Sequence, residues 1–310
     1  MHAVVVTAFD QPPRYQEIAE PVAHGENEML VDVLAAGLHP RVRSQADGSH
    51  YTSTDELPLI PGVDGVVRDA QGRLRYAILD DTVWGTMAER TVIDAGRSIL
   101  LPDDADPVAV AAAMNPAMSS WVALRRRIDF RPGQSVLVLG ATGNAGRMAV
   151  QVAKEFGAGE IVGAARDVGA LQRLVKLGAD RVLPLDRLAD ASDVDVALDY
   201  LWGEPTARAM VDIVTARRDR GRPLRWVQIG SVAGASCSVP SAALRASRLD
   251  IVGSGIGSVP GRDWLEELPE LAAAILRGGF DIRAEAVPLA DAGRVWAGDR
   301  GGDRRIVLVP

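Results

Sequence analysis

The feature that most constrains this chain is a strand, a glycine-rich turn and a helix that follow one another between Ser135 and Phe156. Residues 135–139 read SVLVL, an unbroken apolar run typical of a strand that is buried on both faces of a parallel sheet. Three glycines follow at three-residue spacing, and apolar residues then recur at helical spacing. This order predicts a βαβ unit, and we place its second strand at residues 160–164.

The turn itself predicts a phosphate site. Glycines allow a tight turn, and the first N–H groups of the helix have no partner inside it. Together with the helix dipole, these groups favour a pyrophosphate over an ordinary turn without ligand. Asn144 and Ala145 are expected to offer their backbone N–H groups. The candidate cofactor-binding residues of the turn are Gly140, Thr142, Gly143, Asn144, Ala145 and Gly146.

The choice of dinucleotide depends on the residues that follow the second strand. A site that prefers NAD usually has a carboxylate there for the ribose hydroxyls. This chain has Ala165, which cannot bind the ribose, and then Arg166, whose planar guanidinium suits a 2′-phosphate. We therefore predict NADP(H) as the cofactor. The alternative is that Asp167 accepts from the ribose and that Arg166 is an ordinary surface charge.

Composition limits the other possibilities. A length of 310 residues favours two domains. The net charge of −7 and the absence of a long basic run argue against nucleic acid as a partner. We find no apolar stretch of about 18 residues and no signal-peptide pattern at the start, so we expect no membrane span and a cytoplasmic location. A single cysteine, Cys237, excludes an internal disulfide and the usual thiolate zinc clusters.

The two halves differ in their patterns. Residues 1–118 predict a mainly β domain, with a strand returning at residues 85–93 and an irregular polar segment at residues 41–54. Residues 119–259 alternate between strands and helices, which predicts an α/β fold with a Rossmann-type, doubly wound parallel sheet. In such a sheet, ligands bind outside the carboxyl ends of the strands. Further cofactor-binding candidates therefore follow two later strands: Gly230, Ser231 and Ser254.

Several short motifs, in this order and spacing, resemble the medium-chain dehydrogenase/reductases, and most of all the zinc-free quinone oxidoreductases of the zeta-crystallin type. The resemblance covers nearly the whole chain. It rests on residues 35–40 (AAGLHP), 59–65 (LIPGVDG), 85–89 (GTMAE), 131–143 (RPGQSVLVLGATG), 177–180 (LGAD) and 304–308 (RRIVL). It implies a GroES-like β-rich catalytic domain that residues 260–310 complete, and a homodimer. It also implies that NADPH binds between the two domains and passes hydride to a small-molecule substrate, a quinone or an α,β-unsaturated carbonyl.

The resemblance also assigns candidate residues. His39 stands where relatives commonly have an Asn near the nicotinamide; as a neutral imidazole it is expected to donate a hydrogen bond or supply a proton, or else to be structural. Tyr51 matches a loop tyrosine whose hydroxyl can bond the acceptor's carbonyl, with a simple surface aromatic as the alternative. Ser119 stands where relatives have a Thr beside the nicotinamide half, and Arg305 matches a basic residue near the cofactor phosphate.

No zinc site is expected. Zinc-dependent members of the superfamily hold the metal with Cys and His ligands, whereas the segment after Gly62 reads Val-Asp and lacks the His. His39, His50 and Asp64 do not have the spacing of a metal site. Two other functions stay open on the sequence: a cofactor-binding sensor or structural protein with little turnover, and a reductase of carrier-bound enoyl groups.

Overall fold

The structure, a computed structural model, describes residues 1–298 and 304–310 and divides into two compact units. Unit 1 comprises Met1–Asn115, Leu268–Gly278 and Ile282–Pro310, and unit 2 comprises Pro116–Glu267 and Gly279–Asp281. The sequence suggested changes after residues 118 and 259. The chain instead changes unit inside two helices, α2 (Pro107–Val122) and α7 (Gly261–Leu276), each of which has a proline at or next to the change.

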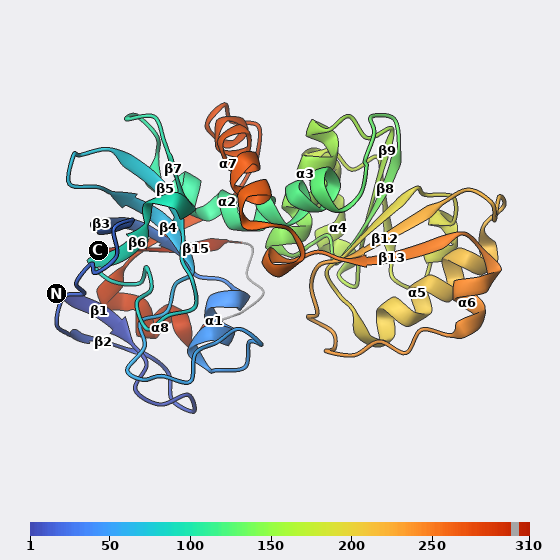
Figure 1. Ribbon diagram of the computed structural model, residues 1–310. Coiled ribbons are helices and arrows are strands. Elements are labelled where there is room, and N and C mark those ends of the chain that lie inside the picture. The colour runs from blue at the N-terminus through green and yellow to red at the C-terminus, as the bar shows by residue number, and fades with distance from the viewer. Residues whose placement is uncertain (299–303) are drawn as a thin grey trace. The chain divides into compact units, whose positions relative to one another are not determined.

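Unit 2 contains a six-stranded parallel sheet in the order β10-β9-β8-β11-β12-β13. In chain order this is 3-2-1-4-5-6, the arrangement of a dinucleotide-binding fold, with the direction of winding reversed between β8 and β11. In Figure 1, α3 and α4 pack together, and α5 and α6 form a second pair. The strands are β8 (Ser135–Leu139), β9 (Glu160–Ala165), β10 (Arg181–Pro184), β11 (Val196–Asp199), β12 (Leu224–Gln228) and β13 (Leu249–Gly253).

The helices of unit 2 begin and end where their sequences specify. The Asp167 side chain accepts from the N–H of Ala170 and caps α4, and Gly178, with a φ of 112°, ends that helix in the left-handed conformation. The helices are α3 (Asn144–Glu155), α4 (Val168–Leu177), α5 (Gly203–Ala216) and α6 (Ser241–Ala246), and η2 (Ala123–Arg127) is a π-helical continuation of α2.

Unit 1 is built on a seven-stranded mixed sheet. Its order is β14-β15-β3-β4-β5-β7, with β6 also paired to β3, and β1 and β2 form a separate antiparallel pair. β15 pairs with β3, so the last strands rejoin the first domain as predicted. The strands are β1 (His2–Val5), β2 (Arg14–Glu17), β3 (Glu28–Gly37), β4 (Asp64–Arg68), β5 (Leu74–Ile78), β6 (Arg90–Asp94), β7 (Ser98–Leu100), β14 (Ala284–Pro288) and β15 (Arg305–Val309).

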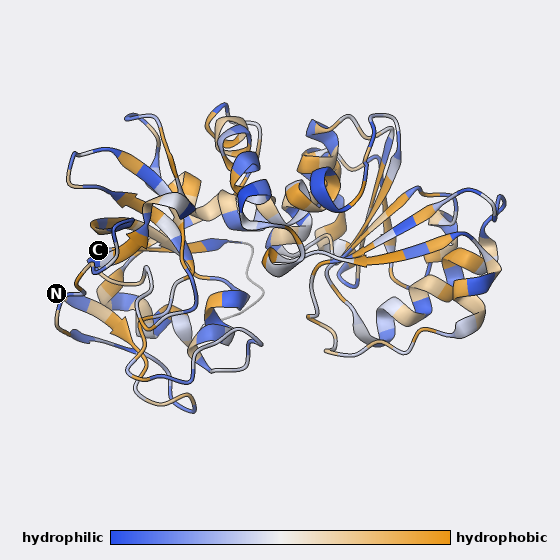
Figure 2. Ribbon diagram, viewed as in Figure 1, coloured by the Kyte–Doolittle hydropathy of each residue, from blue (hydrophilic) through white to orange (hydrophobic). Residues whose placement is uncertain are grey.

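Each unit has its own apolar core. In unit 2 the core joins side chains of the sheet, such as Leu137 and Trp226, to those of α5, such as Met210. In unit 1 a core cluster includes Val4, Ile60 and Leu308. Figure 2 shows the strands of the six-stranded sheet coloured mainly as hydrophobic, with hydrophilic residues in the loops and on the helices.

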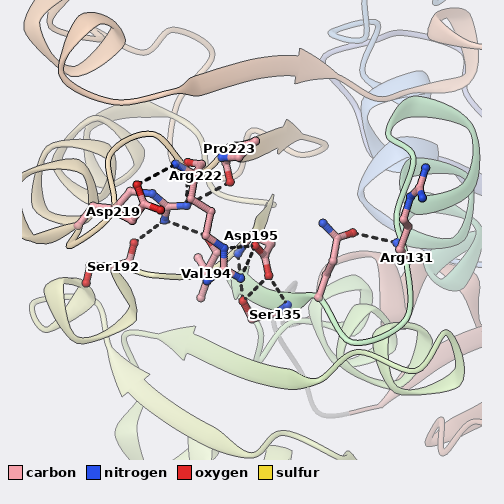
Figure 3. A network of polar contacts seen from close by, with 10 residues as sticks. Arg131, Ser135, Ser192, Val194, Asp195, Asp219, Arg222 and Pro223 are labelled. Atoms are coloured by element: carbon pink, nitrogen blue, oxygen red, sulfur yellow. Dashed lines mark hydrogen bonds and ion pairs between the residues drawn. The ribbon is translucent and has the colours of Figure 1, made fainter.

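A polar network joins the amino ends of β8, β11 and β12 (Figure 3). The Asp195 carboxylate accepts from the backbone N–H and the hydroxyl of Ser135, at 2.8 and 2.9 Å, and from Arg222 Nε at 2.7 Å. Nearby, the buried Arg217 donates to the carbonyls of Ser192, Val194, Arg222 and Pro223. The network lies at the end of the sheet opposite the carboxyl ends where ligands bind, so we assign it a structural role.

Three expectations from the sequence were wrong. Residues 41–54 are not wholly irregular, because α1 (Pro40–Ala46) begins with a proline and buries Val42. The strand expected at residues 85–93 is confined to β6, since Met87 bonds instead to Pro61 and to Val4 of β1. The third is the absence of an apolar stretch of about 18 residues. Among the described residues, the helical stretch Pro107–Arg127 is long and apolar enough to cross a membrane, but 72% of its apolar window is buried inside the protein, as in a core helix.

Candidate functional site

The glycine turn after β8 has room for a ligand at its outer side. Gly140 has a φ of 80°, in the left-handed region that favours glycine. A Cβ atom on Gly146 would lie 2.3 Å from the Gly140 carbonyl oxygen, so no side chain fits there. A Cβ atom on Gly143 would meet only that same oxygen, at 3.5 Å, so the space beside Gly143 is open. A pyrophosphate needs this combination of a tight turn and an accessible backbone.

The start of α3 is suited to an anion. Gly143 is the N-cap residue and has no side chain to satisfy the first N–H groups, which belong to Asn144 and Ala145. Arg147 in the first turn donates to Asn144 Oδ1 at 2.5 Å. A cation at this end of a helix opposes the dipole unless an anion binds nearby. The chemistry of these groups therefore fits the phosphates of a dinucleotide.

Arg166 lies close to this turn. The N–H groups of Gly140 and Ala141 both donate to the Ala164 carbonyl, at 2.9 and 3.0 Å, which fixes the turn against the end of β9. Arg166 is exposed just beyond that end and makes no hydrogen bond or ion pair with the described residues. Its rival Asp167 already uses Oδ1 to cap α4, at 3.1 Å from Ala170 N. Arg166 is thus the side chain with donors to spare for a 2′-phosphate.

Ser119 bonds a residue that sequence reasoning missed. The Ser119 hydroxyl donates to the Pro116 carbonyl at 2.8 Å and lies 2.9 Å from the Tyr200 hydroxyl, which directly follows β11. Burial raises the pKa of Tyr200 to about 12, although its hydrogen bonds to Ser119 and Ser120 oppose the shift, so it is a neutral donor at physiological pH. Its place at the carboxyl end of a sheet strand is the signal that could have identified it.

The loop after β11 is held in an unusual conformation. Trp202 has a φ of 55°, which is rare for a bulky residue and costs of order 1–3 kcal/mol. The buried carboxylate of Asp199 stabilises the loop by accepting from the N–H groups of Leu201 and Trp202, at 2.8 and 3.1 Å. Its second oxygen accepts from Thr206 and Trp226, at 2.7 and 3.0 Å. The sequence alone did not indicate this arrangement.

The later predicted residues follow β12 and β13, and Gly230 contacts the same loop. Gly230 donates its N–H to the Asp199 carbonyl at 3.1 Å, and a Cβ atom on it would lie 2.8 Å from the Tyr200 carbonyl oxygen. Ser254 follows β13 and donates its N–H to the Gln228 carbonyl at 2.8 Å. Ser231 is exposed beside Gly230. The structure thus gathers most predicted residues of unit 2 at the carboxyl ends of its sheet, and their contacts with a cofactor stay predictions.

In unit 1, His39 belongs to a buried polar cluster, which we call the His39 cluster: His39, Asp64, Tyr76 and Arg305. His39 Nε2 lies 2.9 Å from Asp64 Oδ1, and the Tyr76 hydroxyl donates to Asp64 Oδ2 at 2.8 Å. Burial lowers the pKa of His39, and the Asp64 hydrogen bond opposes this shift without cancelling it. Burial also raises the pKa of Tyr76 well above 10. Both side chains are therefore neutral near pH 7.

Arg305 is also buried, at 3% exposure, in β15. Burial lowers its pKa to about 10, while the charge of Asp64 acts in the opposite direction. Its Nε and one terminal nitrogen, Nη2, are buried without a hydrogen-bond partner in the described structure. Its predicted contact with the cofactor phosphate stays a prediction.

The other predicted catalytic residue has a very different environment. Tyr51 is 83% exposed and its ring stacks on His50, with the ring centroids 4.3 Å apart. His50 Nδ1 lies 2.9 Å from the Thr52 hydroxyl, which Arg41 also contacts at 2.9 Å. The Tyr51 side chain thus lies on a loop that these contacts hold in place, and its contact with a substrate stays a prediction.

A metal centre requires several ligating side chains that lie close together. Among residues 1–298 and 304–310, no group of three or more His, Cys, Asp or Glu side chains is placed to hold a metal ion. His39 and Asp64 are adjacent, but their facing atoms already bond each other.

Comparisons with known proteins agree on one family. No family model matches the chain. A probable NADPH-dependent quinone reductase of Emericella nidulans, tdiC, is 32% identical over 359 aligned residues, which cover 100% of both proteins. A chloroplastic NADPH-dependent alkenal/one oxidoreductase of Arabidopsis thaliana is 27% identical over 57% of this chain and 50% of its own length.

Solved structures give the same answer. The quinone oxidoreductase from Thermus thermophilus, which was also solved in complex with NADPH, superposes with a TM-score of 0.80 at 25% identity and covers 100% of both chains. With a full-length relative above 30% identity and this architecture, the chain belongs to the zinc-free quinone oxidoreductase family of the medium-chain dehydrogenase/reductases.

Proposed function

We propose that this protein is an NADPH-dependent reductase that transfers hydride to a quinone or to an α,β-unsaturated carbonyl. The observation that carries the proposal is the glycine turn of unit 2. The turn is open at Gly143, and the neighbouring Arg166 makes no hydrogen bond or ion pair with the described residues. The names of the full-length relative and of the structural neighbour support both the cofactor and the acceptor. The alkenal/one oxidoreductase supports the enone as a second acceptor class.

The residues of the chain would bind and orient rather than react covalently. When bound, NADPH supplies the hydride. The N–H groups of Asn144 and Ala145 would hold the pyrophosphate, and Arg166 would hold the 2′-phosphate. The Tyr200–Ser119 pair would keep the wall at the carboxyl end of β11 rigid. The proton that completes the reduction can come from water, so no side chain is required as an acid.

The test is NADPH consumption by metal-stripped protein with an ortho-quinone, a para-quinone, an enone and a simple aldehyde, with NADH in parallel. We expect turnover of a quinone or enone with NADPH. Saturable NADPH binding without turnover of any acceptor would favour a binding protein instead. Activity that returns only with added zinc would contradict the zinc-free mechanism.

Arg166→Ala tests the cofactor preference. Because one charge-assisted contact to phosphate would be lost, we expect the KM for NADPH to rise at least about tenfold, with little change for NADH. Lys176→Ala, which removes an exposed charge from the last turn of α4, is the matched control. Equal weakening of both cofactors by Arg166→Ala would remove the argument for the 2′-phosphate.

We also propose a homodimer and a cytoplasmic location. β13 is an edge strand of the six-stranded sheet, and its Ile251 and Val252 side chains are only partly buried in the single chain. A second copy could cover these side chains by pairing with that edge. Sedimentation at several concentrations would test the dimer, and cell fractionation would test the location.

A further inference from the structure

The His39 cluster limits what His39 can do. His39 is the residue before α1, Asp64 begins β4, Tyr76 lies in β5 and Arg305 begins β15, so four separate elements place these side chains together. His39, Asp64 and Tyr76 are all at most 3% exposed. Such groups must bond one another, because water does not reach them freely.

The hydrogen bonds fix where the protons are. The Tyr76 hydroxyl is neutral and donates to Asp64 Oδ2, and the negative charge of the Asp64 carboxylate acts to raise the pKa of the nearby Arg305. An ionised carboxylate only accepts hydrogen bonds. The nitrogen that faces Asp64 Oδ1, His39 Nε2, must therefore carry the proton. In a neutral imidazole the other nitrogen, Nδ1, is then a bare acceptor.

This result changes the role expected from the sequence. Asn at this position could donate to a ligand, but the only proton of neutral His39 is already used on Asp64. His39 Nδ1 makes no hydrogen bond with any described residue. The neighbouring Arg305 has two buried nitrogens without partners, and a Cβ atom on Gly37 would lie 3.6 Å from Arg305 Nη2 and 3.7 Å from His39 Cδ2. The cluster thus has unsatisfied polar atoms that indicate a missing partner.

We propose that His39 is a hydrogen-bond acceptor for a ligand hydroxyl, through Nδ1, and that Asp64 and Tyr76 are positioning residues that fix its tautomer. The inference rests on the proposed function. The hydroxyl belongs either to the ribose of the cofactor or to the reduced, quinol form of the acceptor. Reduction adds one hydride and one proton to the acceptor, and His39 has no proton on Nδ1 to give, so this proton comes from water.

Nitrogen NMR of the ¹⁵N-histidine-labelled full chain tests the tautomer directly. The chain has four histidines; His39→Asn assigns the signals of His39 by their loss. We expect the neutral Nε2–H form in the free protein at pH 7. A neutral Nδ1–H form, or a doubly protonated ring at pH 7, would overturn the proposal.

Ligands are then added separately: NADP⁺ alone, and a simple benzohydroquinone alone. We expect one of them to shift the Nδ1 signal in the direction of an accepted hydrogen bond. The ligand that causes this shift is the source of the hydroxyl. His39→Leu should weaken that ligand about tenfold, whereas His39→Asn, which keeps an acceptor oxygen, should stay within about threefold. No shift with either ligand, or equal affinities for the Leu variant and the wild type, would overturn the proposal.

Tyr76→Phe provides a variant that leaves His39 in place. With one donor fewer on Asp64, the carboxylate should stabilise a protonated His39 more strongly, so the pKa of His39 should rise while the Nε2–H tautomer persists. A Tyr76→Phe variant with an unchanged His39 titration would remove Tyr76 from the positioning role. Failure of all NADPH turnover, with the tautomer and the ligand shift intact, would contradict the proposed function alone. Turnover without any ligand shift would contradict this inference alone.

Discussion

Two buried carboxylates, one in each unit, differ in the hydrogen bonds that they accept. Asp199 in unit 2 is fully buried and accepts four hydrogen bonds, two from backbone N–H groups and two from side chains. Asp64 in unit 1 is equally buried, and its two side-chain donors are His39 and Tyr76. Neither of the two side chains that bond Asp199 has a buried polar atom without a partner in the described structure, whereas Arg305, beside Asp64, has two.

The difference separates a structural carboxylate from one that prepares a site. Around Asp199, the hydrogen bonds stabilise a strained backbone, since Trp202 has a positive φ. Around Asp64, the bonds set the proton position of a histidine and leave its second nitrogen open. We therefore expect changes at the first to act on stability, and changes at the second to act on ligand affinity and pH dependence.

The largest effect is expected from Asp199→Ala. This change leaves the hydroxyl of Thr206, the indole N–H of Trp226 and the N–H groups of the loop without their acceptor. Each unsatisfied buried donor costs about 1–3 kcal/mol, so the free energy of unfolding should fall by at least about 3 kcal/mol. Urea unfolding followed by tryptophan fluorescence measures it.

Asp186→Ala is the matched control, because Asp186 is exposed and its loss should change stability by less than about 0.5 kcal/mol. An Asp199→Ala protein as stable as this control would show that the four bonds do not hold the loop.

The sequence predicted the frame of unit 2 well, because its signals are local. The apolar strand, the spacing of Gly140, Gly143 and Gly146 and the cap at Gly178 each act within a few residues, and the alternation of elements implied the parallel sheet. Arg166 could be predicted for the same reason, since its place follows from the end of β9.

The buried clusters could not be predicted in this way. His39 bonds Asp64 across 25 residues, and Tyr200 bonds Ser119 across 81, so each contact depends on how distant elements pack. The sequence likewise left open whether Tyr51 is a surface aromatic and whether His39 is structural, and only the fold showed that Tyr51 is exposed and His39 buried. The residue types indicated which side chains could donate or accept hydrogen bonds. Only the fold showed which of these groups already bond one another inside the protein.

A smaller effect is expected from Tyr200→Phe, which tests whether the hydrogen bond between Tyr200 and Ser119, like those of Asp199, acts on stability. The change removes one hydroxyl that lies 2.9 Å from Ser119 Oγ. We expect the free energy of unfolding to fall by about 1 kcal/mol, the usual net value of one such bond. Ser119→Ala and the double variant complete a cycle. If the two single losses simply add, the hydroxyl pair does not contribute as a pair.

The smallest effect concerns pH and the His39 cluster. Burial lowers the pKa of folded His39 below its ordinary value of 6.5, so the unfolded chain binds a proton on His39 more readily than the folded one as pH falls through 6.5. Stability should therefore decrease on going from pH 7 to pH 6, by at most about 0.7 kcal/mol from this one residue. Urea unfolding at both pH values measures the decrease.

The comparison is sharpest in a His50→Gln background, because burial lowers the pKa of His50 as well. In that background, His39→Asn should flatten the dependence of stability on pH, and the exposed His24→Gln serves as the matched loss of one imidazole. A slope that His39→Asn leaves unchanged would mean that His39 is protonated equally in the folded and unfolded states. That outcome would weaken the contrast between the two carboxylates, since folded His39 would then gain a proton between pH 7 and pH 6 as readily as an unfolded one, and Nδ1 would lose its acceptor character over that range.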